Sequence, residues 1–397
     1  MRHLIRKSIK KVQGVALNFK RYLHATIDWT DRLIIIKGAR GVGKTTLLLQ
    51  HIKETHGVAE EALYVSLDDI WFADNRLTDL AEQFANTGGR YLFIDEVHKY
   101  PEWSQEIKNI YDDHHDLQIV LTSSSALQIA SGKGDLSRRA VIYELNELSL
   151  REYIALEENI DLKPLRLDEL FSHHLSISAE IAQATKPLKA MKNYLSKGNY
   201  PYFRENPGNY HHRLQSTVNT ILETDLPAIL NMDYSSVIKL KKLLYVIATS
   251  GPFKPNISAL SEKTGIARDT LLRYLHHLSE AHLIQLLHSS KQGMSYLAKP
   301  DKIYLYNTNL FEALTGNQAN TGTMRETFFL NQVSNIASVR MHDKGDYLVN
   351  DHYVFEIGGK NKTSKQLKGL ANAYVAADDI ETGYRNQVPL WLFGMLY

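Results

Sequence analysis

The residues with the clearest chemical potential form one glycine-rich segment, Gly38 to Thr45. It fits the pattern Gly-x-x-x-x-Gly-Lys-Ser/Thr, with an apolar run before it and a helix-forming run after it. Glycines let a backbone wrap around phosphate and present its N–H groups at a helix N-terminus. We predict that Lys44 reaches the β- and γ-phosphates of ATP and that the Thr45 hydroxyl ligates Mg²⁺. A glycine-rich turn that fits by chance is the alternative. The residues expected to contact nucleotide are Gly38, Ala39, Arg40, Gly41, Val42, Gly43, Lys44, Thr45 and Thr46.

A second candidate lies where the apolar run Tyr91–Ile94 ends in two acids, Asp95 and Glu96. We expect Asp95 to hold the magnesium through water and Glu96 to orient or deprotonate the attacking water. Strands that merely end in solvated acids are common, so this prediction depends on its pairing with the upstream loop. An acid directly after the magnesium aspartate favours hydrolysis of ATP over the phosphate transfer of a kinase.

Two further segments carry groups suited to phosphate chemistry. The run Gln118–Leu121 is followed by four hydroxyl residues at 122–125, one of which can contact the γ-phosphate or the lytic water. A hydroxyl that caps the end of the strand explains the pattern equally well. Arg138 and Arg139 follow a Gly-Lys-Gly loop. An arginine there can act as a finger on the transition-state charge, although a solvated surface pair is the simpler explanation.

These groups need a sheet that brings the ends of several strands to one edge. Short apolar runs separated by helical stretches predict an α/β domain over 1–146, with a mostly parallel sheet covered on both faces. The expected strands are Leu33–Ile36, Ala62–Leu67, Tyr91–Ile94, Gln118–Leu121 and Ala140–Leu145.

The rest of the 397-residue chain is long enough for further domains. Over 147–235 the strand signals fade, which predicts a helical lid after the nucleotide domain. Over 236–300 we expect two helices joined by a turn at Thr264–Gly265, which is typical of a winged helix-turn-helix. A small hairpin is expected to follow, through Leu287, Tyr296 and Leu297 around Gly293. Residues 301–397 return to an α+β pattern, with strands expected around Ile303–Tyr306, Tyr347–Val349 and Tyr353–Ile357.

Composition narrows the chemistry and the location. The chain contains no cysteine, which excludes disulfides and thiolate zinc sites and fits a reducing, cytoplasmic location. No run approaches the roughly 18–20 apolar residues that span a bilayer, and no secretory signal is expected, so we predict no membrane partner. The formal net charge of +2 is close to neutral and says little about other partners.

With these motifs in place, the chain resembles a group of prokaryotic AAA-type ATPases. Members of that group carry a P-loop domain, a winged helix and a C-terminal domain similar to the PD-(D/E)xK nuclease fold, and related ATPases often form rings, which implies a possible homo-oligomer. The similar segments are GARGVGKTT at 38–46, FIDEVHKYPEW at 93–103, LTSSS at 121–125, DLSRRAVIYELNELSLREY at 135–153 and KPDKIYLYNTNL at 299–310.

The resemblance also implies roles for single residues. Ser124 falls near the sensor position of the group. Arg139 takes the place of an arginine that usually follows a glycine, but this chain has Arg138 where that glycine is expected. The resemblance implies that nucleotide is bound by Gly38, Gly43, Lys44 and Thr45. It implies that Asp95 and Glu96 serve magnesium and water, in agreement with the roles derived above.

A nuclease of the PD-(D/E)xK kind needs acids gathered on a strand pair and a lysine that assists the attacking water. The candidate acids are Glu326, Asp346 and Glu356. The expected lysine is missing, because Gly358 stands in its place and Lys360 lies two residues further on. Asn307 also stands where an acid is often found. We therefore favour a degenerate domain that does not cut.

Basic residues outnumber acidic ones over 241–300. This excess can neutralise phosphates of double-stranded DNA, and Arg268, Thr270 and Arg273 can face a groove. Winged helices also serve as protein-contact modules, so a protein partner through 236–300 is an equal alternative. The favoured function is an ATPase that couples its nucleotide state to the C-terminal modules. The alternatives are a DNA-binding regulator that uses ATP as a switch and a metal-dependent nuclease.

Overall fold

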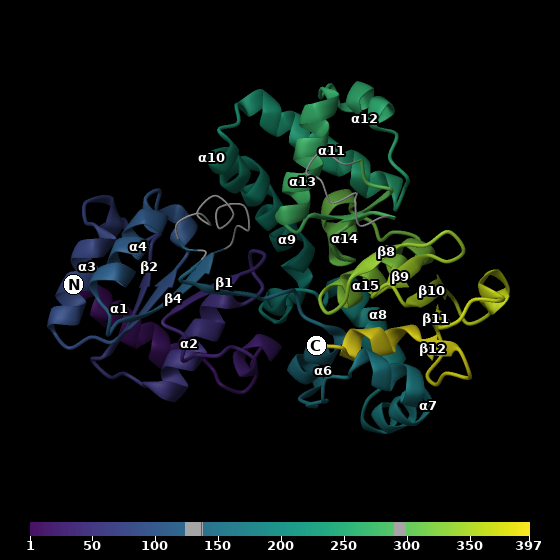
Figure 1. The fold of residues 1–397 in the computed structure, drawn as a ribbon, viewed down its shortest axis with the longest axis horizontal. Helices are drawn as coiled ribbons and strands as arrows, with labels where there is room; N and C mark the ends of the chain where they lie inside the picture. The colour runs from purple at the N-terminus through teal and green to yellow at the C-terminus, as the bar shows by residue number, and fades with distance from the viewer. Residues whose placement is uncertain (124–135, 137, 290–298) are drawn as a thin grey trace. The chain divides into compact units, whose positions relative to one another are not determined.

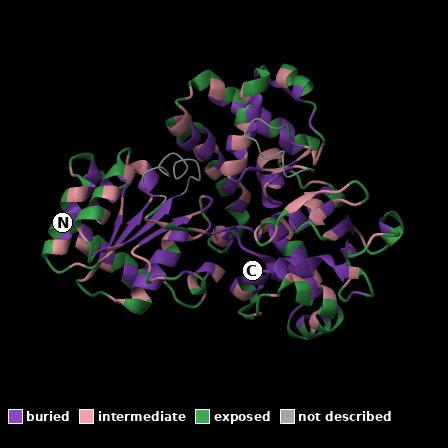
Figure 2. Cartoon of the chain, viewed as in Figure 1, coloured by how far each residue is buried: buried purple, intermediate pink, exposed green. Residues whose placement is uncertain are grey.

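The computed structural model of the protein describes residues 1–123, 136, 138–289 and 299–397 (Figure 1). The chain divides into two compact units, Met1–Glu147 and Leu148–Tyr397. In both units the buried residues lie in the strands and on the inner faces of the helices (Figure 2). Within the described ranges, no helix is both long enough and apolar enough to cross a membrane.

The first unit is built on a sheet of five strands in the order β2-β3-β4-β1-β5, with every neighbouring pair parallel. This confirms the α/β class and the parallel sheet predicted from the apolar runs. Strand β4 lies between β1, which leads into the phosphate loop, and β3, which ends at Asp95. The strands are β1 Leu33–Lys37, β2 Ala62–Ser66, β3 Tyr91–Asp95, β4 Gln118–Ser123 and β5 Val141–Glu144.

Helices cover both faces of this sheet, because its central strands are apolar on both sides. Helices α3 and α4 share a buried cluster with Leu33 and Ile35, and α2 lies on the opposite side (Figure 1). Helix α1 packs along the edge strand β2, where Ser8 Oγ accepts a hydrogen bond from the Tyr64 N–H at 3.0 Å. This contact satisfies a backbone group that a sheet edge leaves unpaired. The helices are α1 Arg2–Gly14, α2 Lys44–Thr55, α3 Leu77–Asn86 and α4 Trp103–Asp113.

The second unit combines helices with a mixed sheet of order β12-β11-β10-β9-β8, in which β10, β11 and β12 are parallel and the pairs β8–β9 and β9–β10 are antiparallel. Its strands are β8 Val339–Met341, β9 Tyr347–Val349, β10 Tyr353–Gly358, β11 Ala373–Ala377 and β12 Gln387–Pro389. Its helices are α6 Leu150–Glu158, α7 Leu167–Ala184, α8 Pro187–Lys197, α9 Tyr210–Thr220, α10 Leu226–Leu230, α11 Tyr234–Ser250, α12 Ile257–Thr264, α13 Arg268–Glu280, α14 Asn309–Thr315 and α15 Thr321–Ser334.

The helices expected to form a lid over 147–235 pack within the second unit, against its C-terminal elements. The Ser149 hydroxyl, which caps α6, donates to the Tyr397 backbone oxygen at 2.7 Å. The Phe171 ring on α7 stacks on Tyr374 of β11 with centroids 4.5 Å apart. The sequence showed that these stretches are helical, but helical periodicity does not say which surface an apolar face covers.

The helix-turn-helix is present as α12 and α13, with Gly265 in the left-handed region at a φ of 69° between them. The strand that follows, β6 Ile284–Leu287, pairs antiparallel with β7 Lys302–Leu305. The predicted partner around Tyr296 lies outside the described residues. The sequence analysis placed Ile303–Tyr306 in the last domain, but these hydrogen bonds tie β7 to the winged helix, so a boundary at residue 300 separates two paired strands.

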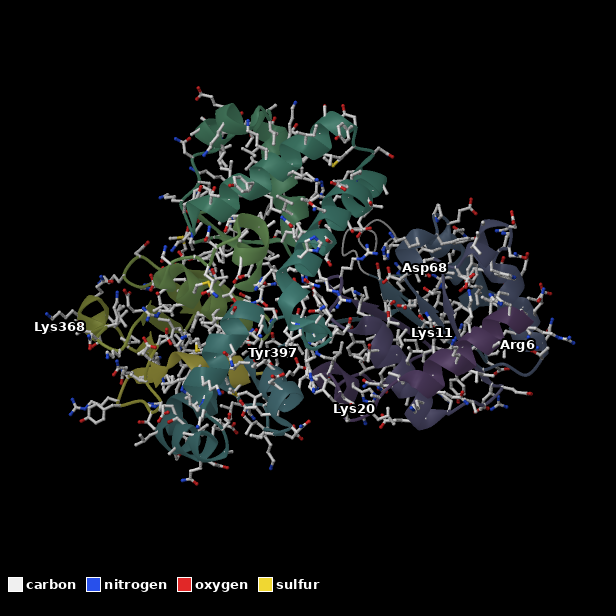
Figure 3. All side chains as sticks on the ribbon, turned by 180° about the vertical axis from the view of Figure 1, so that it is seen from behind. Arg6, Lys11, Lys20, Asp68, Lys368 and Tyr397 are labelled. Carbon is white, nitrogen blue, oxygen red and sulfur yellow. The ribbon has the colours of Figure 1, made fainter. Side chains whose placement is uncertain are left out.

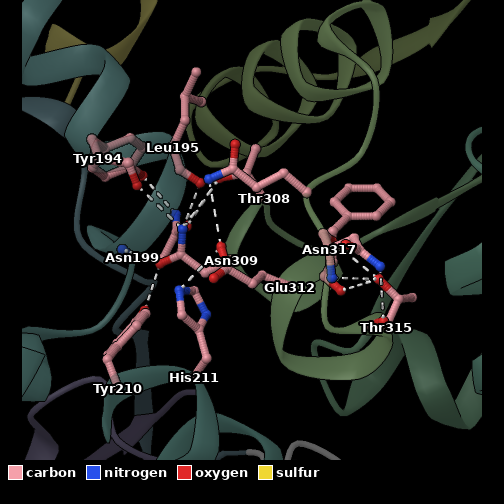
Figure 4. A network of polar contacts seen from close by, with 12 residues as sticks. Tyr194, Leu195, Asn199, Tyr210, His211, Thr308, Asn309, Glu312, Thr315 and Asn317 are labelled. Atoms are coloured by element: carbon pink, nitrogen blue, oxygen red, sulfur yellow. Dashed lines mark hydrogen bonds and ion pairs between the residues drawn. The ribbon is translucent and has the colours of Figure 1, made fainter. Parts of the chain in front are cut away.

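A buried network of amide and phenol groups fixes α14 against α8 and α9 (Figure 4). The Asn309 side chain donates to the Tyr194 and Leu195 carbonyls at 3.2 and 2.9 Å and accepts from the Asn199 N–H at 2.9 Å. Asn307, which stands where an acid is often found, is also buried and donates to the Tyr200 hydroxyl at 3.0 Å. Buried amides of this kind stabilise a fold only when they are paired, so these asparagines hold helices together.

Candidate nucleotide site

The backbone of the phosphate loop needs glycine at specific positions. A Cβ at Gly38 would lie 2.2 Å from the Leu145 carbonyl oxygen, so no other residue fits there without a shift of the backbone. Gly43 has a φ of 101°, a left-handed conformation that favours glycine. Helix α2 begins at the next residue, Lys44. The loop therefore ends at a helix N-terminus, where free N–H groups and the helix dipole favour an anion.

The Lys44 side chain lies across this loop. It is only 5% exposed, and its Nζ donates to the Gly38 and Ala39 carbonyls at 2.8 Å each. A buried ammonium needs such partners, because burial without them is costly. The loop thus holds a positive charge beside its own N–H groups, at the position where the sequence predicted contact with the β- and γ-phosphates.

Asp95 joins three strands and the phosphate loop. Its Oδ2 accepts from the Thr45 hydroxyl and from the Tyr64 hydroxyl, both at 2.7 Å, and its Oδ1 accepts from Thr122. Asp95 is 2% exposed. The structure brings Thr45 and Asp95 together, as the two motifs required, and orients the carboxylate with hydroxyls from β2 and β4.

The sequence analysis included Thr122 only as one of the four hydroxyl residues at 122–125, and it did not select Tyr64. The register explains both contacts, since Ser66 lies opposite Asp95 and Leu121 opposite Ile94. Leu121 is paired with Ile94, so Thr122, the next residue, lies beside Asp95. The residue preferred as the sensor, Ser124, lies outside the described residues. Tyr64 gave no local signal, because a tyrosine in an apolar strand is ordinary.

Glu96 occupies a constrained position directly after β3. Its φ is 56°, a left-handed conformation that is unusual for a residue with a side chain, and its N–H donates to Thr122 Oγ1 at 3.1 Å. Its Oε2 lies 3.3 Å from Nε2 of the buried His98. Burial raises the pKa of the Glu96 carboxyl, the nearby Lys44 ammonium opposes this, and Asp95 adds to it. A carboxylate with a raised pKa is well suited to accept a proton.

The two arginines considered as fingers have other surroundings. The Arg139 fork donates from Nε and Nη2 to the two Asp112 oxygens, both at 2.9 Å. Arg138 is exposed. Arg139 is therefore paired with the end of α4, and its role as a finger stays a prediction.

A buried arginine that the sequence analysis did not select braces the phosphate loop. Arg21 is 4% exposed and donates to the Asn146 and Glu147 carbonyls at 2.7 and 3.0 Å. It also donates to the carbonyl of Val42 within the loop. One guanidinium thus connects the phosphate loop with the last residues of the first unit.

The C-terminal acids each have partners. Glu326 Oε2 accepts from Lys302 at 2.6 Å and from the Tyr304 hydroxyl at 3.0 Å. Asp346 Oδ2 accepts from the Ile357 N–H at 2.7 Å. Burial raises the pKa of Asp346 to about 6, with smaller contributions from Glu356 and Glu326, so the three acids lie near one another.

The lysine near these acids comes from an unexpected position. Lys362 Nζ lies 2.5 Å from Glu356 Oε1, whereas the predicted Lys360 is exposed. A Cβ at Gly358 would lie 2.5 Å from the Lys362 side chain, so the lysine stem fills the space above the glycine. Among the described residues, no group of three or more His, Cys, Asp and Glu is arranged to hold a metal ion.

The predicted DNA-facing residues lie on α13. Arg268 is exposed at its start, and Arg273 Nη2 donates to Thr270 Oγ1 at 3.2 Å. Thr270 and Arg273 line a cavity of about 510 Å³ together with Asn231 and Asp233, from the connection that precedes α11. Thr270 and Arg273 therefore lie beside the connection that precedes α11, and the side chains of Arg268 and Arg273 are exposed.

The parallel sheet, the loop at a helix N-terminus and the Thr45–Asp95 pair together form a P-loop nucleotide site. In agreement, residues 30–154 match a family model described as an AAA domain, and residues 188–321 match a model described as a domain of unknown function (DUF8612). No nuclease family is among these matches.

Similar proteins are known among sequences and structures. The uncharacterized protein MJ1637 of Methanocaldococcus jannaschii is 27% identical over 265 residues, which cover 64% of this chain and 56% of that protein. The chain thus spans about half the length of this relative. The structure of the Walker-type ATPase paby2304 of Pyrococcus abyssi aligns with 78% of this chain and with 94% of its own chain, with 12% identity and a TM-score of 0.41. AMPPCP-bound DnaA from Aquifex aeolicus covers 70% of this chain and 87% of its own, with 15% identity and a TM-score of 0.25.

Proposed function

We propose that the chain binds ATP with Mg²⁺ in the first unit and hydrolyses it. The observation that carries the proposal is the 2.7 Å contact between Thr45 Oγ1 and Asp95 Oδ2. It places a hydroxyl and a carboxylate oxygen side by side at the start of α2, and oxygen ligands of this kind suit Mg²⁺. The N–H groups of the phosphate loop and the Lys44 ammonium complete a set of donors for a triphosphate.

In this proposal each residue has one task. Lys44 binds the β- and γ-phosphates, and Thr45 together with Asp95 holds the magnesium, which neutralises charge on the phosphates. Glu96 orients the attacking water and accepts its proton, and its raised pKa supports that task. Thr122 positions both acids through its hydroxyl.

The test is a comparison of binding and turnover in three proteins. Lys44→Ala should lose ATP binding, measured with a fluorescent ATP analogue in the presence of Mg²⁺. Glu96→Gln should bind the analogue like the wild type and release phosphate at least about a hundredfold more slowly. If Lys44→Ala bound ATP as tightly as the wild type, the assignment of the loop would be wrong. If Glu96→Gln kept full turnover, another group would be the base.

We further propose that the nucleotide state is communicated along the chain to the second unit. Arg21 supports this, since it contacts both the phosphate loop and the last two residues of the first unit. A partner of residues 236–300, whether double-stranded DNA or a protein, and assembly into a homo-oligomer remain predictions. An ATPase assay with and without duplex DNA, together with a solution mass, tests both.

A further inference from the structure

The C-terminal sheet carries a cationic cavity of about 610 Å³ that has no part in the proposed ATPase chemistry. One wall is the segment 362–370, the other is the turn 384–387, and β11 forms the floor through Ala373 and Val375. Four basic residues line the cavity, and none of the described residues that line it is acidic. These four are Lys362, Lys365, Lys368 and Arg385.

Both walls are fixed by the fold. Tyr384 and Gln387 exchange backbone hydrogen bonds of 2.9 and 3.0 Å, which closes the turn. His174 Nε2 lies 2.9 Å from the Arg385 carbonyl, and the Asn386 side chain donates to the Ala373 carbonyl at 2.8 Å. The opposite wall is anchored by a short 3₁₀ turn, Ser364–Leu367, whose leucine is buried. The cavity is therefore shaped before any ligand arrives, which reduces the entropy lost on binding.

The charges on these walls point to an anionic ligand. Lys365, Lys368 and Arg385 are exposed, and the ion pairs found within the described ranges do not involve them. Figure 3 shows the Lys368 side chain extending away from the ribbon. Lys362 differs, because its Nζ lies 2.5 Å from Glu356 Oε1 and its charge is largely compensated. Three cations thus face solvent around one concave surface.

An aromatic ring stands beside these cations. The Tyr384 side chain is 67% exposed, and the Arg385 guanidinium carbon lies 5.1 Å from its ring centroid. A ring this exposed buries little apolar surface, so it contributes little to the stability of the fold. Grooves that combine cations with exposed aromatic rings bind single-stranded nucleic acid, because the cations follow the phosphates and the ring stacks on a base.

We propose that this cavity binds single-stranded nucleic acid. Phosphates lie against Lys365, Lys368 and Arg385, and one base stacks on Tyr384. The site is separate from the α13 face predicted to meet duplex DNA.

The test uses the full chain and a fluorescein-labelled oligo-dT of about 16 nucleotides, the upper range for one such binding surface. Fluorescence anisotropy should give an affinity that falls steeply with salt. The double variant Lys365→Ala/Lys368→Ala should bind at least about tenfold more weakly, and its log–log salt slope should be smaller by about 1.4, or about 0.7 for each lost phosphate contact. Tyr384→Leu should weaken binding about fivefold or more.

The matched control is Lys189→Ala/Lys192→Ala, which removes the same charge from exposed positions on α8. It should bind like the wild type, and basal ATP turnover should be unchanged in all variants. Unchanged urea denaturation of each variant shows that the second unit, which carries the cavity, is folded. Arg385→Asn extends the series, since asparagine tolerates the φ of 52° at that position. The proposal is overturned by any of three results. The first is that the oligonucleotide does not bind at low salt. The second is that the α8 control and the cavity variant lose affinity equally. The third is that Arg268→Ala/Arg273→Ala loses binding while the cavity variant does not. Equal or tighter binding of a duplex of the same length would also overturn the single-strand assignment.

Discussion

The hydroxyls of Thr45 and Tyr64 donate to the same oxygen of Asp95, each at 2.7 Å. Thr45 lies at the start of α2 and Tyr64 lies in the edge strand β2, so a helix and a strand both hold this carboxylate. Lys11 of α1 donates in turn to the Tyr64 hydroxyl at 3.2 Å. The orientation of the predicted magnesium carboxylate therefore depends on the sheet edge and on the N-terminal helix.

Removal of the Tyr64 hydroxyl should leave Asp95 with fewer constraints. Tyr64→Phe keeps the buried ring and removes one hydrogen bond to a charged group, which contributes about 1.5–3 kcal/mol. We expect the free energy of unfolding to fall by about that amount and Mg²⁺-dependent turnover to fall several-fold, with ATP affinity changed little. Urea denaturation and phosphate release measure the two effects. A variant with unchanged turnover would show that Thr45 and Thr122 suffice to orient Asp95.

Thr122 should matter through its hydroxyl. Thr122→Val preserves the shape of the side chain but removes the donor to Asp95 and the acceptor for the Glu96 N–H. We expect turnover to fall about tenfold, less than for loss of a direct acid–base group. Thr122→Ser retains the hydroxyl and is the matched control, with turnover close to the wild type. Equal loss in both variants would point to packing of the methyl group as the cause.

The pH dependence of turnover should reflect Glu96. Burial raises the pKa of this carboxyl above its ordinary value, so it takes up a proton at a higher pH than an exposed glutamate does. A base must be deprotonated to work, and turnover should therefore decline as the pH falls through that raised pKa. The pH profile of kcat/KM, measured at ATP concentrations well below KM, reports this group in the free enzyme. A profile that stays flat down to the pKa of an ordinary glutamate would contradict the assignment.

The stability of the first unit should fall in acid because of His51. This ring is 7% exposed and stacks on Trp29 with centroids 3.6 Å apart. Burial, and then the neighbouring His24 and His56, lower the pKa of His51 from 6.5 to about 3. His51 therefore binds a proton more readily in the unfolded chain than in the folded one. The contribution of the neutral, buried His51 to stability is complete above pH 6.5 and is lost as the pH falls towards 3.

The expected slope in that window is at most about 1.4 kcal/mol per pH unit. His51→Phe keeps a ring on Trp29 but cannot take up a proton, so its urea midpoint should change less between neutral and acidic pH. Tryptophan fluorescence follows the transition. The control is His115→Gln at an exposed position of the same unit, which should retain the wild-type pH dependence. An identical acid response in His51→Phe would assign it to other groups.

Arg21 should connect nucleotide binding with the end of the first unit. Arg21→Lys keeps the charge but cannot donate to three carbonyls in the fixed geometry of a guanidinium. We expect a non-hydrolysable ATP analogue to slow amide hydrogen exchange at Asn146 and Glu147 in the wild type, and to slow it much less in Arg21→Lys. Lys20→Ala, next in sequence and exposed in its pair with Glu54, should behave like the wild type. Protection that is unchanged in Arg21→Lys would remove the proposed connection.

The sequence alone was sufficient to predict the strands of the first unit and the motifs of its candidate nucleotide site. Its five strands were predicted within a few residues, because short apolar runs and glycine-rich breaks are local signals. The types and spacing of Gly38 to Thr45, and the two acids after Tyr91–Ile94, also identified the phosphate loop and the carboxylates. These are local patterns, and the chemistry they predict needs only that two strand ends meet at one edge of a parallel sheet.

Only the tertiary structure decided which other side chains meet there. Tyr64, Thr122 and Arg21 reach the site through strand register and burial, which depend on residues far apart in the chain. For the same reason α6 and α7 were assigned to a lid, although α6 contacts the C-terminal segment Leu390–Met395 and α7 contacts the C-terminal sheet. Periodicity gives each element its apolar face and leaves its partner undetermined, because the partner is chosen by the packing of the whole fold.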